Sequence, residues 1–167
     1  LFSRLAERLR GGDLADQARF ELALLQFYRG RFDAAQTQAK ATSANTSSDV
    51  TNDAIELRVL IQQNKGPDSL NTPLRLYAKA QFDIRRHRYP KAETRLDSLL
   101  QTYARHSLAD DARFRRAEIA LARGDTSTAL NRFRTLPQQH PRSTYADRSL
   151  FRLGRLYEQQ GDSDRAI

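Results

Sequence analysis

The chain has 167 residues, of which 39% are hydrophobic, and it carries a formal charge of +8 with a mean hydropathy of -0.73. It has no cysteine, which excludes disulfide bonds, thiolate catalysis and cysteine-based zinc sites. No apolar run approaches the roughly 20 residues that a membrane helix needs, and no signal peptide is visible. Glycine and proline are few among many Ala, Leu, Arg and Gln residues, so the composition favours an all-α fold.

The positive charge comes mainly from arginine and gives a pI near 10.3. A basic balance favours an acidic partner, which leaves nucleic acid, an anionic membrane surface and acidic protein as alternatives. A solvated arginine-rich surface without a partner explains the charge equally well, because the basic residues are spread along the chain instead of forming one arm.

Helical spacing and stop signals predict a series of short helices in chain order. The segment 1–10 has apolar residues at helical spacing before a glycine pair, and we expect it to be the second helix of a truncated repeat. The next helix is expected to begin with Asp16 as its N-cap and to end at Gly30. A partner helix is expected from Asp33 to about Lys40.

The middle of the chain departs from this simple alternation. Residues 41–50 have loop composition, and one extra helix is predicted near residues 52–64. Pro73 is expected in the first turn of a helix that runs to about Arg86, and Pro90 in the first turn of another that extends to about Tyr103.

The segment Leu108–Gly124 recurs along the chain. Similar strings open at Leu14 and Tyr145 and end at Gly30 and Gly161. We expect Asp110 or Asp111 to cap the helix over 108–123. Thr126 is expected to cap the next helix, which ends near Pro137. The string that opens at Tyr145 is expected to form a helix from Asp147 to Gln160.

The spacing of one alanine measures the repeat. The alanines of the successive second helices are Ala35, Ala92, Ala129 and Ala166, so that they are separated by 57, 37 and 37 residues. Two equal spacings indicate an internal repeat, and the longer one accommodates the extra helix with its loop.

The residues at these positions resemble the tetratricopeptide repeat. Leu153, Gly154, Tyr157 and Ala166 have the spacing of that family's core, and the preceding unit has similar residues at or near the corresponding places, namely Ala117, Ala120, Ala129, Phe133 and Pro137. The string at Tyr145 looks like the repeats of TolA-binding periplasmic proteins and outer-membrane assembly lipoproteins. The resemblance implies a right-handed α-solenoid of antiparallel helix pairs. Small residues are expected where the two helices of a pair cross closely, at Ala23, Ala80, Ala117 and Gly154.

We therefore expect a single helical-repeat domain over residues 1–167 that is a fragment of a longer chain. Its predicted repeat halves are 1–10, 14–42, 50–105 with the inserted helix, 108–137 and a truncated 145–167.

In the resembling family the first helices line a groove that holds a partner's peptide or helix. Projected onto this chain, the resemblance predicts partner-binding residues at Phe20, Tyr77, Phe114, Arg115, Glu118, Arg148, Phe151, Arg152 and Arg155. Arginine beside aromatic rings suits an acidic peptide or a terminal carboxylate. The alternative is that the rings belong to the core between repeats and that the arginines are solvated.

Other candidate sites have simpler explanations. The densest basic run, 85–88, fits a charged helix end better than a nucleic-acid site, since the chain has no recognisable nucleic-acid motif. His87, His106 and His140 lack the spacing of metal ligands. No Ser-His-Asp arrangement, P-loop or dinucleotide fingerprint occurs. The sequence predicts no enzyme, cofactor or metal.

These observations favour a non-enzymatic scaffold that binds a protein or peptide, in the bacterial periplasm or at the outer membrane, with the cytoplasm as the alternative location. A self-associating module is the second interpretation, and a basic nucleic-acid-binding surface through Arg85, Arg86 and Arg88 is the least favoured.

Overall fold

The computed structural model describes residues 12–44, 49–66 and 70–162, and this part of the chain contains helices and turns and no strand. The all-α, helical-repeat prediction is confirmed. The chain divides into two compact units, Leu1–Lys79 and Ala80–Ile167. None of the described helices is both long and apolar enough to cross a membrane.

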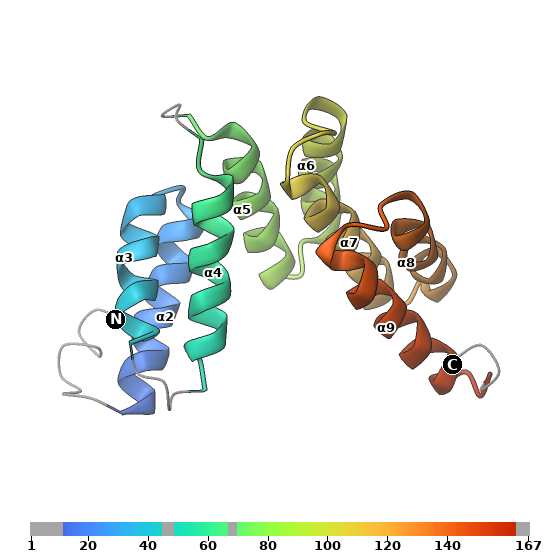
Figure 1. Ribbon diagram of the computed structural model, residues 1–167, viewed down its shortest axis with the longest axis horizontal. Helices are drawn as coiled ribbons and strands as arrows, with labels where there is room; N and C mark the ends of the chain where they lie inside the picture. The colour runs from blue at the N-terminus through green and yellow to red at the C-terminus, as the bar shows by residue number, and fades with distance from the viewer. Residues whose placement is uncertain (1–11, 45–48, 67–69, 163–167) are drawn as a thin grey trace. The chain divides into compact units, whose positions relative to one another are not determined.

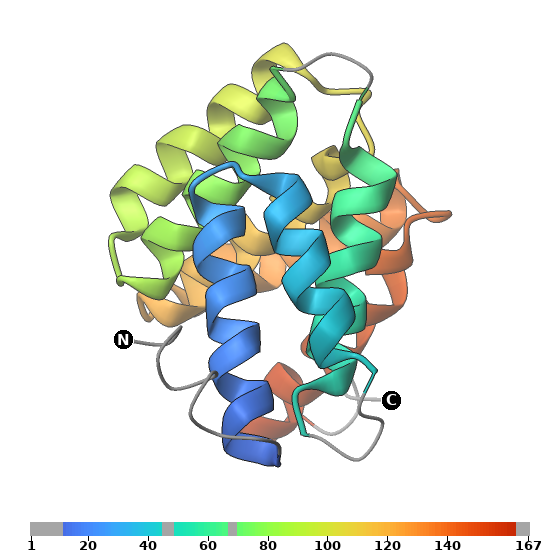
Figure 2. The same ribbon diagram turned by 90° about the vertical axis from the view of Figure 1, so that its left-hand side faces the viewer.

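The first unit is built from neighbouring short helices. They are α2 (Asp13–Tyr28), α3 (Phe32–Thr42), α4 (Thr51–Asn64) and the first half of α5 (Thr72–Arg85). Helix α3 packs against both α2 and α4, so the three lie side by side (Figures 1 and 2). Helix α4 is the extra helix that the sequence predicted near residues 52–64.

The second unit holds the equally spaced repeats. After the end of α5 come α6 (Tyr89–Thr102), α7 (Leu108–Ala122), α8 (Thr126–Gln139) and α9 (Thr144–Gln159). Helix α7 packs against α6, α8 and α9, and α8 also packs against α9 (Figure 1). The core of α7–α9 consists of Phe114, Ala117, Ala120, Ala129, Phe133, Leu136, Leu153, Leu156 and Tyr157.

The small residues expected at close crossings lie mostly in the interior. Ala23, Ala80 and Ala117 are buried, whereas Gly154 is half-buried. Ala117 belongs to the core between α7, α8 and α9, where a larger side chain would have to displace close-packed neighbours.

Several predicted helix starts are wrong by one to three residues. Helix α2 begins at Asp13, so Asp16 lies inside its first turn and pairs with Arg19 instead of capping the helix. Helix α8 is capped by Asp125, whose carboxylate accepts a hydrogen bond from the Thr128 backbone N–H at 3.0 Å, and not by Thr126. At α8 the residue one position nearer the N-terminus caps the helix, whereas at α2 the N-cap is Gly12 and no side chain caps it.

The predicted start of α9 and the predicted cap of α7 also lie too far toward the C-terminus, although α7 itself begins at Leu108 as expected. Helix α9 begins at Thr144 instead of Asp147, and the hydroxyl of its N-cap Ser143 accepts from the Tyr145 N–H at 3.2 Å. Ser107 occupies the N-cap position of α7, which places Asp110 and Asp111 in the first turn. The helix expected over 1–10 and the second helix expected after Ser163 lie outside the described residues.

Candidate functional site

The four aromatic residues of the predicted groove have different environments. Tyr77 in α5 and Phe114 in α7 are buried, and Phe20 in α2 is half-buried. Phe151 in α9 is 67% exposed. Of these four rings, therefore, Phe151 is the one that offers most of its surface to a partner.

At Phe114, the equivalent position one repeat earlier, the ring is covered by other aromatic side chains. Its ring lies 5.5 Å from that of Phe133 in α8 and 4.9 Å from that of Tyr145 in α9, measured between centroids. Phe114 therefore belongs to the core of the α7–α9 helices and contributes packing energy. Phe151 follows it by one repeat of 37 residues and lies next to Leu150, which is also exposed; the positions one repeat after Phe133 and Tyr145 would be 170 and 182, outside the 167-residue sequence.

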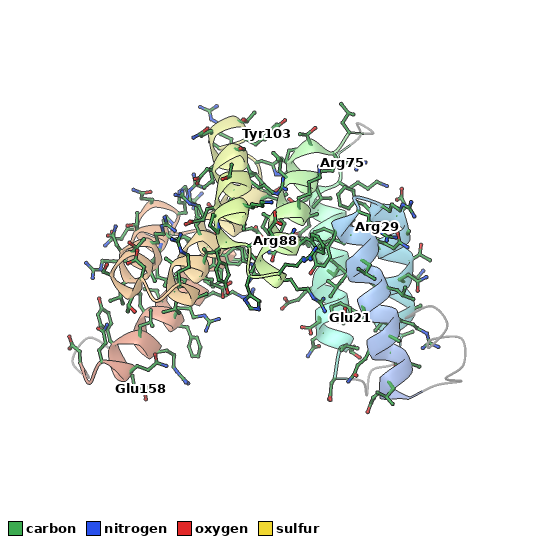
Figure 3. All side chains as sticks on the ribbon, turned by 180° about the vertical axis from the view of Figure 1, so that it is seen from behind. Glu21, Arg29, Arg75, Arg88, Tyr103 and Glu158 are labelled. Atoms are coloured by element: carbon green, nitrogen blue, oxygen red, sulfur yellow. The ribbon has the colours of Figure 1, made fainter. Side chains whose placement is uncertain are left out.

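Three arginines surround Phe151 on the same side of its helix. Residues 148, 151, 152 and 155 share a side because they are three, four and seven positions apart; we call these four the α9 face. Arg148 lies over the Tyr145 ring at 5.6 Å. Arg155 is 3.7 Å from Glu158, which lies near the C-terminal end of α9 (Figure 3).

The remaining arginine of the α9 face is tied to α7. Arg152 Nη2 donates to Glu118 Oε1 at 3.0 Å, and Arg115 Nη1 donates to the other oxygen of the same carboxylate. Glu118 thus holds one arginine from its own helix and one from α9. The structure brings Arg115, Glu118 and Arg152 together, and the binding of a partner at these residues stays a prediction.

A buried carboxyl group lies close to this triad. Asp111 accepts a hydrogen bond from the Tyr145 hydroxyl at 2.7 Å, which joins α7 to α9. Burial raises the pKa of Asp111 above its ordinary value, against the Tyr145 hydrogen bond and the charge of Arg115, which lower it. Burial also lowers the pKa of His106, although the charge of Asp111 opposes this shift. Asp111 is therefore a structural residue of the helix junction.

Its neighbour Asp110 forms a pair that the repeat reproduces. Asp110 lies 3.1 Å from Arg113, just as Asp16 lies 2.8 Å from Arg19 in the matching string of α2. His140 Nδ1 is 3.5 Å from Asp110 as well. The recurring Asp and Arg three residues apart could have revealed this pairing in the sequence, because such residues meet on one side of a helix.

A second polar cluster, which the sequence did not predict, lies between α6, α7 and α8. Glu93 in α6 accepts from Arg123 at 2.9 Å and from Arg132 at 3.2 Å. A polar pocket of about 280 Å³ is lined by Glu93, Ala120, Arg123, Asp125, Thr128 and Arg132. Because Glu93 already binds both arginines, this pocket presents little unbalanced charge.

The basic run at the end of α5 is exposed. Arg86 lies over the Phe82 ring at 5.4 Å, and His87 Nδ1 is 2.9 Å from the Tyr89 hydroxyl. Arg88 follows at the start of α6 (Figure 3). No group of acidic, histidine or cysteine side chains suited to hold a metal was found among the described residues.

Comparison with protein families matched the second unit. A tetratricopeptide-repeat family model matches residues 111–143 and 148–167, the segments that contain the α9 face and most of α7 and α8. Neither curated proteins nor solved structures gave a significant match. The match supports tetratricopeptide repeats over residues 111–143 and 148–167, while the narrower resemblance to TolA-binding and outer-membrane lipoprotein repeats stays a prediction.

Proposed function

We propose that this chain is a non-enzymatic scaffold that binds an acidic peptide or helix of another protein on the α9 face. The observation that carries the proposal is Phe151, a large aromatic side chain that is 67% exposed and has arginines on both sides along its helix. Tetratricopeptide repeats generally mediate contacts between proteins, which agrees with this role.

The chemistry of the α9 face favours a partner with both apolar and acidic groups. Aromatic and arginine side chains supply most of the binding energy in many protein interfaces, and guanidinium groups form strong hydrogen bonds with carboxylates. The second unit has 17 basic and 11 acidic residues, so it carries +6 of the total formal charge of +8. Such a field would attract an acidic partner and accelerate its association.

A role in bacterial envelope assembly is the more specific form of the proposal. It is supported by the resemblance of the string at Tyr145-Ala146-Asp147 to envelope-protein repeats. Fractionation of cells that express the full-length protein tests it: recovery with the periplasm or the outer membrane is expected, and recovery with the cytosol alone would reject the envelope role while leaving the scaffold role intact.

The binding surface can be tested by reversing the charge of Arg155 and by replacing Phe151. Purified chain is used to capture proteins from native lysate, and captured partners are identified by mass spectrometry. Arg155→Glu and Phe151→Ser are expected to remove specific partners. Arg142→Glu is the matched control because Arg142 is an exposed arginine outside the α9 face. If both variants of the α9 face capture the same proteins as the wild type, this surface is not the binding site.

Self-association is the second candidate function, and the exposure of neighbouring Leu150 and Phe151 favours it. Exposed apolar side chains that adjoin one another are typical of protein interfaces. Light scattering over a range of concentrations distinguishes the two functions: a mass that rises with concentration and returns to the monomer value in Phe151→Ser would support self-association.

A further inference from the structure

We infer that Glu118 is an internal competitor of the partner: its carboxylate occupies the guanidinium groups to which a carboxylate of the partner would bind. This inference rests on the proposed function, because it concerns the ligand chemistry of the same surface. It explains why two arginines that suit an acidic partner are already paired.

The geometry of the triad is that of a bound carboxylate. Both oxygens of Glu118 accept from guanidinium groups, one from Arg115 and one from Arg152 at 3.0 Å. The side chains are accessible, with exposed fractions of 33% for Arg115, 23% for Glu118 and 46% for Arg152. A carboxylate from outside could therefore reach the same donors.

The internal repeat shows that the fold does not require an acid at this position. Arg115 and Arg152 are separated by one repeat of 37 residues and are thus equivalent, whereas the residue equivalent to Glu118 in α9 is Arg155. The arginine is present in both helices, but the acid that neutralises it occurs only in α7. Glu118 consequently supplies the one carboxylate that these two equivalent arginines share in the described structure.

Exchange of this carboxylate for another is physically accessible. Ion pairs between partly exposed side chains contribute little net stability, and a partner's carboxylate would restore the charge-assisted hydrogen bonds that Glu118 gives up. Glu118 would then reduce the affinity for weakly acidic segments and favour partners that replace its contacts in full and also cover Phe151. Its effect is on the selection of the partner.

The test uses a fluorescein-labelled peptide of alternating glutamate and alanine with one central phenylalanine, and fluorescence anisotropy with the whole 167-residue chain. Glu118→Gln removes the competing charge while keeping the side-chain shape, so binding is expected to tighten by about 2–5-fold, the upper part of the range of a released surface ion pair. Glu158→Gln is the matched control, because Glu158 pairs with Arg155 of the same face and its loss changes the net charge equally. The control is expected to tighten binding by less than about twofold.

Unchanged or weaker binding by Glu118→Gln, or equal gains in both variants, would overturn the inference. Phe151→Ser separates this failure from that of the proposed function: if it abolishes binding while Glu118→Gln has no effect, the surface is correct and the competitor is not. If wild type and Glu118→Gln both fail to bind, or if Phe151→Ser binds like wild type, both proposals are rejected. Thermal melts followed by circular dichroism verify that each variant is folded.

Discussion

Asp111 is the residue whose charge state is expected to affect stability most directly. Burial raises its pKa in the folded chain above the unfolded value of 3.8. The folded state therefore binds this proton more tightly, and the contribution of Asp111 to stability is largest below pH 3.8 and is lost as the pH rises through the folded pKa. At neutral pH the ionised side chain destabilises the fold.

The substitution Asp111→Asn tests whether the ionised Asp111 side chain destabilises the fold at neutral pH. Asparagine can still accept the hydrogen bond of the Tyr145 hydroxyl but carries no charge. The variant is expected to be more stable than wild type at neutral pH, and the difference should shrink as the pH falls through the folded pKa. Urea unfolding across this range measures it, with the exposed Asp147→Asn as control. A wild type that is the more stable of the two at neutral pH would contradict the prediction.

At the scale of helices, the same C-terminal turn closes the first helix of every repeat. Gly30, Gly124 and Gly161 have positive φ angles of 72°, 79° and 76°, and His87 occupies the equivalent position with φ 55°. The positions are separated by 57, 37 and 37 residues, as the alanines are. At His87 the Arg88 N–H donates to the Asp83 carbonyl at 2.8 Å, just as the Asp125 N–H donates to the Ala120 carbonyl at 2.9 Å after Gly124. Histidine therefore occupies a position that suits glycine.

This turn yields a pair of opposite predictions. His87→Gly places glycine at a position with a left-handed backbone conformation, where a residue with a Cβ is strained, and is expected to stabilise the second unit by about 1 kcal/mol. Gly124→Ala introduces that conformation where nothing lies within 4 Å of the new Cβ, so it should destabilise by about 1 kcal/mol through the backbone alone. Both values come from chemical denaturation. Destabilisation by His87→Gly would contradict the prediction and would mean that the contact between His87 and the Tyr89 hydroxyl stabilises the fold by more than the backbone strain costs.

The predicted helices and their true starts show which signals are local. The periodic apolar residues and the equal spacings of 37 residues were sufficient to predict the helix pairs and the extra helix α4. The caps were not predictable in the same way, because Asp125 and Thr126 are both good capping residues and only the backbone geometry selects Asp125. Helix boundaries are set by such choices between neighbours.

For the whole molecule, the candidate site was less predictable than the fold because exposure depends on distant segments. Phe114 and Phe151 occupy the same place in two similar strings, and Phe133 and Tyr145 cover the first ring, whereas the equivalent positions for the second ring, 170 and 182, are not in the given sequence. The pairing of Arg115 and Arg152 through one glutamate likewise requires two helices to be in place. A recurring stretch of sequence identifies equivalent positions in successive repeats, but it does not say which residues of other helices lie beside them.

Repeat architecture also predicts how damage to the core spreads. Phe133 is fully buried in α8 and packs edge-to-face against Phe114, so Phe133→Ala should cost about 3–5 kcal/mol in the second unit. In proteins built from repeats each unit gains its stability from its nearest neighbours. Hydrogen exchange followed by mass spectrometry is therefore expected to show lost protection in α7–α9, with protection retained in α2–α4.

The control for this experiment is Phe151→Ala, which truncates the same type of side chain at an exposed position in α9 and should change stability by less than about 0.5 kcal/mol. Its exchange pattern should match that of the wild type. If Phe133→Ala instead removes protection equally from α2 to α9, the two compact units unfold together, and stability would be a property of the entire chain. Protection lost only near α8 would show that cooperativity extends no further than one helix pair, because the nearest-neighbour terms would then be too weak to link successive repeats.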